Sequence, residues 1–154
     1  MPIEIRRFGV GHRRAVGPPG SVGLTGQVLH SDGRGTVTEV ALARDARIEP
    51  HSSPNTTWFI VVEGGGWVGV DEEWTRIAAG EAALWPADVP HTAWTEHSEM
   101  RAIVVELAGA DDRDTVIGRA AEADRAVPVE RGIGRLAART GTVDGANPSD
   151  GEPV

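Results

Sequence analysis

Two histidines, His51 and His91, are the side chains of this sequence whose types and surroundings favour chemistry. A neutral imidazole can accept a hydrogen bond, take up a proton near physiological pH, or bind zinc, iron, nickel or copper. Each histidine lies next to a short segment rich in β-branched and aromatic residues, which is typical of a strand. Because successive strand residues point to opposite faces, each histidine shares its face with residues at even spacing from it.

This alternation predicts two polar faces that could meet inside one sheet. The predicted ligand-binding residues are those on the two faces: His51, Ser53, Thr57, Phe59, His91, Ala93 and Thr95. Residues of the other parity, such as Trp58 and Val62, are expected to face away. A polar cluster of this kind inside an apolar barrel can orient a small ligand.

The types of side chain on these faces leave two interpretations open. Hydroxyl groups are poor ligands for transition metals, and an open metal site with two histidines also needs a carboxylate. Glu39 and Glu106 lie on segments that could supply one, although parity alone does not place them. In the first interpretation the histidines line a pocket and bond to Ser53, Thr57, Thr95 or water. In the second, His51 and His91 hold one divalent metal ion (zinc, iron, nickel or manganese).

The elements that would position these residues are short strands separated by turn residues. Strands are predicted over the following ranges, the first two less strongly: Ile3–Arg7, Thr25–His30, Thr36–Leu42, Thr57–Val62, Trp67–Asp71, Glu73–Ile77, Glu81–Trp85, His91–Thr95 and Arg101–Leu107. Turns are expected at Asp32–Gly35, at the Asp71 hairpin, at Pro86–Asp88, and at Gly64–Gly66, which is interpreted as a hairpin turn. Many short strands at this spacing predict a sandwich or a barrel.

The composition changes after Gly109, which predicts a boundary there. Residues 1–109 are expected to form a β-barrel and residues 110–140 a helical extension, with a helix over Asp111–Ala126 that Pro128 ends. A second, weaker helix is expected over Glu130–Ala138. The last residues, 141–154, are rich in Gly, Pro, Asp and Asn and predict a disordered tail.

Two segments resemble the paired signature motifs of the cupin superfamily. In the first motif, the positions of a glycine, two histidines, a glutamate and a closing glycine are taken here by Asp45, His51, Ser53, Thr57 and Gly64. In the second, the positions of two glycines, a proline, a histidine and an asparagine are taken by Gly80, Asp88, Pro86, His91 and Thr95. Asp45 and Asp88 are tolerable replacements, since Asp adopts positive φ more readily than most residues.

The resemblance implies an all-β fold, a single antiparallel jelly-roll barrel, with the short helical extension at its C-terminal end. In cupins the two histidines and the glutamate of the first motif and the histidine of the second hold a divalent metal. Two of these four ligands, at Ser53 and Thr57, are replaced here. We therefore expect a small-molecule binding protein, with or without metal. The alternatives are a metal-dependent oxygenase or isomerase that uses His51 and His91, and a structural dimer module with a vestigial pocket; whether the protein is an enzyme stays open.

Five tryptophans are a second unusual feature of the sequence. Large aromatic side chains in a barrel of this size mostly fill the core, and this is the favoured interpretation. In the alternative, Trp85 or Trp94 lines a cavity for a flat or apolar ligand.

The overall composition excludes several classes of function. The net charge is -8 and Lys is absent, so no basic surface for nucleic acid is expected. No cysteine is present, which excludes disulfides and thiolate sites. No apolar stretch has the length of a membrane span and Met1–Val10 does not resemble a signal peptide, so a cytoplasmic location is expected. Family resemblance implies a homodimer.

Overall fold

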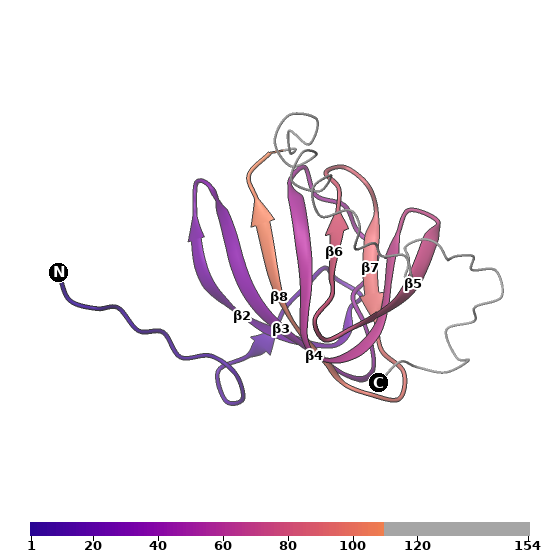
Figure 1. Ribbon diagram of the computed structural model, residues 1–154, viewed down its shortest axis with the longest axis horizontal. Helices are drawn as coiled ribbons and strands as arrows, with labels where there is room; N and C mark the ends of the chain where they lie inside the picture. Colours follow the sequence, from indigo (N-terminus) through magenta and orange to yellow (C-terminus); the bar gives the residue numbers. More distant parts are fainter. Residues whose placement is uncertain (110–154) are drawn as a thin grey trace.

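The computed structural model describes residues 1–109, which contain eight strands and no helix. The strands are β1 (Arg14–Ala15), β2 (Val22–Asp32), β3 (Gly35–Arg47), β4 (Thr56–Val70), β5 (Glu73–Ala78), β6 (Ala82–Trp85), β7 (His91–Trp94) and β8 (Met100–Leu107). All pairings between them are antiparallel, and the ribbon curls round into a barrel with β2 and β3 on one side and β5 on the other (Figure 1). The all-β, cupin-like barrel predicted from the sequence is confirmed.

The barrel closes through a ring of pairings among four strands. β3 pairs with β8, β8 with β4, β4 with β7, and β7 returns to β3 through the single pair Arg47–Trp94. Closure leaves few unpaired backbone groups and fixes which side chains point inwards. β6 pairs with the first half of β4 and β5 with its second half.

β4 corrects one prediction, because Gly64–Gly66 do not form a hairpin turn. The chain continues through these glycines as one strand that changes partners, from β8 and β6 to β5 and β7. Gly64 has a φ of 72°, and a Cβ there would overlap the carbonyl oxygen of Glu99. A Cβ on Gly66 would overlap the carbonyl oxygen of Trp94. These glycines therefore let neighbouring strands approach a bent strand closely, which is a different use of glycine from a turn.

The turns predicted at Asp71 and at Pro86–Asp88 are confirmed. Asp71 and Asp88 have φ values of 57° and 64°, and Asp45, which lies within β3, has a φ of 60°, so all three adopt the left-handed conformation. Asp45 and Asp88 stand where the cupin motifs have glycine, and their conformations explain why Asp is accepted at both positions. The Asp32–Gly35 hairpin joins β2 to β3 as expected.

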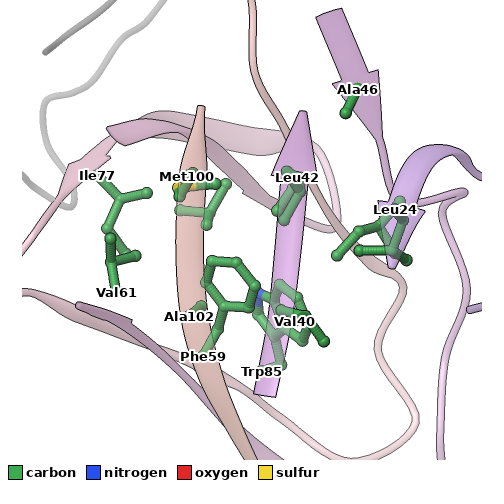
Figure 2. Packing of buried hydrophobic residues seen from close by; sticks show 13 residues of the cluster. Leu24, Val40, Leu42, Ala46, Phe59, Val61, Ile77, Trp85, Met100 and Ala102 are labelled. Atoms are coloured by element: carbon green, nitrogen blue, oxygen red, sulfur yellow. The ribbon is translucent and has the colours of Figure 1, made fainter. Parts of the chain in front are cut away.

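Apolar side chains from several strands fill the barrel. Figure 2 shows Phe59 and Trp85 packed together with Val40 and Ala102 inside it. Phe59 and Val61 are buried whereas Val62 is 39% exposed, so the alternation predicted for this strand is confirmed. The core thus reaches along the inner face of β4 as far as the polar residues at its start.

The prediction for the N-terminal end of the chain was wrong, and the predictions for the C-terminal end are not tested. Ile3–Arg7 forms no strand, so that prediction is wrong; β1 begins only at Arg14. The predicted helices and tail of residues 110–154 lie outside the described residues. Within residues 1–109, no helix is long and apolar enough to cross a membrane.

Candidate functional site

The structure brings His51 and His91 together as a directly paired bridge. The amide of His51 donates to the carbonyl oxygen of His91 at 3.1 Å, and the amide of His91 donates back at 2.8 Å. Directly paired residues project their side chains from the same face. The two imidazole centroids consequently lie 4.4 Å apart, with the rings at 72° to each other.

Both imidazoles are held in the same way, by a carbonyl two residues earlier in the chain. Nδ1 of His51 lies 2.9 Å from the carbonyl oxygen of Glu49, and Nδ1 of His91 lies 3.1 Å from that of Val89. A carbonyl oxygen can only accept, so each Nδ1 carries the proton. In the neutral ring, Nε2 then keeps its lone pair, and neither Nε2 has a hydrogen-bond partner among residues 1–109.

A column of stacked rings fixes His91 from the core side. Its ring stacks on Trp85 with centroids 4.3 Å apart, and Trp85 stacks in turn on Phe59 at 4.8 Å. The three side chains are buried, while His51 at the end of the column is only partly buried. The imidazole pair is therefore preorganised by packing as well as by hydrogen bonds. The indole N–H of Trp85 is also buried without a partner in the described chain.

The surroundings of His91 keep its ring neutral. Burial lowers the pKa of His91 to about 4, and the neighbouring charge of His51 acts in the same direction. The bond to the Val89 carbonyl and the charge of Glu106 oppose this shift but are smaller. At physiological pH, Nε2 of His91 is therefore an acceptor and not a donor.

Glu106 is the carboxylate of this site. The strand register pairs Thr57 with Trp85 on one side and with Glu106 on the other, so all three share the inner face of the barrel. Glu106 Oε2 accepts hydrogen bonds from Ser53 Oγ at 2.8 Å and from Asn55 Nδ2 at 2.7 Å. The side chain of Glu106 is therefore held in place by the segment that leads into β4.

The hydroxyl groups correct the expected hydrogen bonding of the histidines. Ser53 bonds to Glu106, and Thr95 Oγ1 bonds to the backbone of Ala43 and Ala46, so neither serves an imidazole. Thr95 is buried on the same side of its strand as His91, as predicted, but its hydroxyl fastens β3 to the chain after β7. Ala93, with no exposed surface, contributes only to the core.

The other two candidates, Glu39 and Trp94, lie away from the histidines. Glu39 is fully buried but bonds to Arg13 at 2.8 and 3.0 Å and to Arg101 at 3.4 Å. Trp94 lies on the opposite face of β7 from His91, against Trp67 and Trp74. Of the two tryptophans considered as walls of a cavity, only Trp85 contacts the site.

Two imidazoles are too few donors for a resident metal ion of the type that cupins hold. In residues 1–109, no group of three His, Cys, Asp or Glu side chains is arranged to hold a metal ion. Stable zinc and iron sites in proteins use three or four protein ligands. Glu106 does not supply the third ligand, because among the described residues it forms no such group with the two histidines. The donor set therefore does not fit the metal that the fold family implies.

Sequence reasoning missed Asn55, which joins the two chain segments bordering the site. Its side-chain amide donates to Glu106, and its Oδ1 accepts from the amide of Gly109 at 2.7 Å. No local pattern marks an asparagine between a proline and a strand as more than a turn residue. The register of β4 against β8 would have pointed to Glu106, but the pairing of those strands could not be read from either segment alone.

Comparisons with known proteins agree with the fold. Residues 38–107 match the family model described as the cupin domain. The polyketide cyclase RemF from Streptomyces resistomycificus is 21% identical, with a TM-score of 0.60 over 71% of this chain and 82% of that one. A cupin-2 domain from Rhodospirillum rubrum is 16% identical, with a TM-score of 0.58 over 82% and 93%. A predicted oxalate decarboxylase from Thermotoga maritima is 12% identical, with a TM-score of 0.62 over 68% and 98%. No match was found among the curated proteins.

Proposed function

The chain belongs to the cupin superfamily, and from its altered site we propose that it binds a small organic molecule directly on two imidazoles, without a metal ion. The observation that carries this proposal is that the imidazoles of His51 and His91 are hydrogen-bonded in the same way. Both Nδ1 atoms are hydrogen-bonded to the main chain, so the Nε2 atoms are left as acceptors on two rings whose centroids lie 4.4 Å apart. In a metal site the lone pairs of the two Nε2 atoms would bind the ion. Because a third metal-binding side chain is missing, the hydrogen-bond donors of an organic molecule can bind these lone pairs in place of the ion.

The chemistry of the site suggests the class of ligand. It offers two imidazole acceptors and the carboxylate of Glu106, so it favours hydroxyl or amino groups that donate hydrogen bonds. An anion would meet a carboxylate and two lone pairs, which makes a small dicarboxylic acid such as oxalate a poor ligand. A neutral or cationic molecule with several donors, held against the edges of the aromatic column, fits better.

The experiment is a thermal-shift screen of EDTA-dialysed protein with three aromatic compounds of equal size: a diol, an amine and a carboxylic acid. A ligand at about 100 times its Kd stabilises the fold by about 2.7 kcal/mol, which raises the melting temperature by roughly 10 °C. We expect shifts with the diol or the amine and none with the acid. The shifts should disappear in His51→Ala and persist in His97→Ala, the matched control, since His97 is exposed in a turn.

Two results would overturn the proposal. About one equivalent of zinc, iron, nickel or manganese that survives dialysis and is lost in His51→Ala would show a metal site and favour a metal-dependent enzyme. A flat response across the whole panel would favour a structural module with a vestigial pocket. We also propose that the protein acts in the cytoplasm and binds neither nucleic acid nor membranes. Cell fractionation tests this part of the proposal.

A further inference from the structure

Glu106 places a carboxylate on the inner face of the barrel that forms no ion pair within residues 1–109. The ion pairs of these residues use other carboxylates, those of Glu4, Asp32, Glu39, Glu49 and Glu63. Glu106 is also partly buried, and a charge that is removed from water without a counter-charge costs free energy. Such a carboxylate is suited to a ligand that brings a positive charge.

The two hydrogen bonds to Glu106 come from neutral donors whose orientation is fixed. Ser53 Oγ accepts from the amide of Asn55 at 3.1 Å and donates its proton to Glu106 Oε2 at 2.8 Å. Asn55 Oδ1 accepts from the amide of Gly109 at 2.7 Å, which leaves its Nδ2 to donate to the same carboxylate oxygen at 2.7 Å. Because both donors are neutral, they orient the carboxylate without balancing its charge.

The other carboxylate oxygen, Oε1, forms no hydrogen bond within the part of the chain that the structure describes. Glu106 is also close enough to act on His91. Burial lowers the pKa of His91 to about 4, and the charge of Glu106 is among the influences that oppose this lowering. The site thus offers three acceptors: Oε1 of Glu106 and the Nε2 atoms of the two imidazoles, His51 and His91.

On the basis of the proposed function, we propose that this site selects a primary ammonium group, that Glu106 pairs with the charge of this group, and that Asn55 is the positioning residue that orients Glu106. An ammonium group has three N–H donors, which match the three acceptors in number. A hydroxyl group has one donor, and a quaternary ammonium group has none. A hydrogen bond between an ammonium group and a carboxylate is also roughly twice as strong as one between neutral groups.

Calorimetric titration of the EDTA-dialysed full chain at pH 7 tests this selection. The probes are benzylamine, a cation at this pH, and benzyl alcohol, a neutral molecule of the same size. We expect the amine to bind at least about tenfold more tightly, because only the amine forms a charge-assisted bond. Raising the salt concentration from about 0.05 to about 0.5 M should weaken binding of the amine several-fold and leave binding of the alcohol unchanged, since salt screens charges.

Glu106→Gln removes the charge and keeps an oxygen that can accept from Ser53 and Asn55. The Kd of the amine should rise about tenfold in this variant, and that of the alcohol should change by less than about threefold. Glu72→Gln, in the exposed turn between β4 and β5, is the matched control for the loss of one negative charge and should change neither Kd. Asn55→Ala should reduce the ratio of the two affinities. Circular dichroism checks that each variant is folded.

The outcomes separate this inference from the proposed function. Equal affinities for the amine and the alcohol, or a ratio that is the same in wild type and Glu106→Gln, would overturn the inference and leave the proposed function standing. An amine affinity that does not depend on salt would also overturn it, and that measurement needs no variant. Equal weakening of both probes in Asn55→Ala would show that Asn55 supports the fold and does not position Glu106. A wild-type chain that binds neither probe would overturn the proposed function and this inference together.

Discussion

Replacement of His91 by Gln should weaken the dependence of stability on pH in the acidic range. The pKa of His91 is lowered to about 4 in the folded chain, against 6.5 for an unperturbed imidazole. Because its folded pKa lies below the unfolded one, the unfolded chain takes up the proton first as the pH falls. The contribution of His91 to the free energy of unfolding is therefore fully present above pH 6.5, and it is lost progressively as the pH falls from 6.5 to 4.

The size of the effect follows from these two values. The difference in pKa corresponds to a loss of about 2 kcal/mol at pH 5 and about 3 kcal/mol at pH 4. His91 is 3% exposed, so solvent screens the effect only weakly. Of a typical stability of about 5 to 15 kcal/mol, this is a substantial part.

Urea unfolding at pH 7, 6, 5 and 4 measures the effect. The wild-type free energy of unfolding should fall along this curve, and the curve of His91→Gln should be flatter by the amounts given. The same substitution at the exposed His97 serves as the control for replacing a histidine by glutamine. Parallel curves for wild type and His91→Gln would refute the reasoning, because His91 would then titrate alike in the folded and unfolded chains.

Two further predictions concern the elements that position the site. Gly66→Ala should cost at least about 2 kcal/mol in urea unfolding, because its Cβ would overlap the carbonyl oxygen of Trp94, whereas Gly33→Ala, with open space around it, should cost less than about 1 kcal/mol. Glu39→Gln should cost about 2 to 3 kcal/mol at pH 7, since Arg13 loses its buried counter-charge. The bonds from Arg13 lower the pKa of Glu39, so this contribution should be present above about pH 4.5 and vanish as the pH falls below it; an equal loss at pH 2.5 and pH 7 would contradict this account.

The inner and outer faces of the main strands could be predicted because burial imposes a period of two. His51, Phe59 and His91 lie on the predicted inner face for this reason. The prediction that the two histidines meet came from the resemblance to the paired motifs. The meeting of two residues forty positions apart depended on the family resemblance, since no local rule pairs one strand with a particular other strand.

The errors arose where a local rule met a constraint from distant strands. Three glycines after Glu63 look like a turn, and only the close approach of β7 and β8 shows why they serve a bent strand instead. Ile3–Arg7 has the alternation of a strand but no neighbour within residues 1–109 to pair with, so the pattern alone did not make one.

Similar reasoning explains why the chemistry of the histidines was predicted only in part. Their proximity followed from strand faces, but their hydrogen bonds go to main-chain carbonyls of Glu49 and Val89, which side-chain patterns do not reveal. Asn55 was overlooked because its role depends on Glu106, which reaches it from the last strand. Contacts that combine a loop with a distant strand require the register of the whole barrel.

The central claim is that His91 presents an unprotonated Nε2 beside the ring of His51, and that each imidazole donates from Nδ1 to a main-chain carbonyl. A long-range ¹H–¹⁵N correlation spectrum of the histidine rings at pH 7, in metal-free protein, tests it most directly. The account predicts that His91 shows the neutral form with the proton on Nδ1, and that its ring protons give cross-relaxation to those of His51. A proton on Nε2 of His91, or no such cross-relaxation between the two rings, would contradict it.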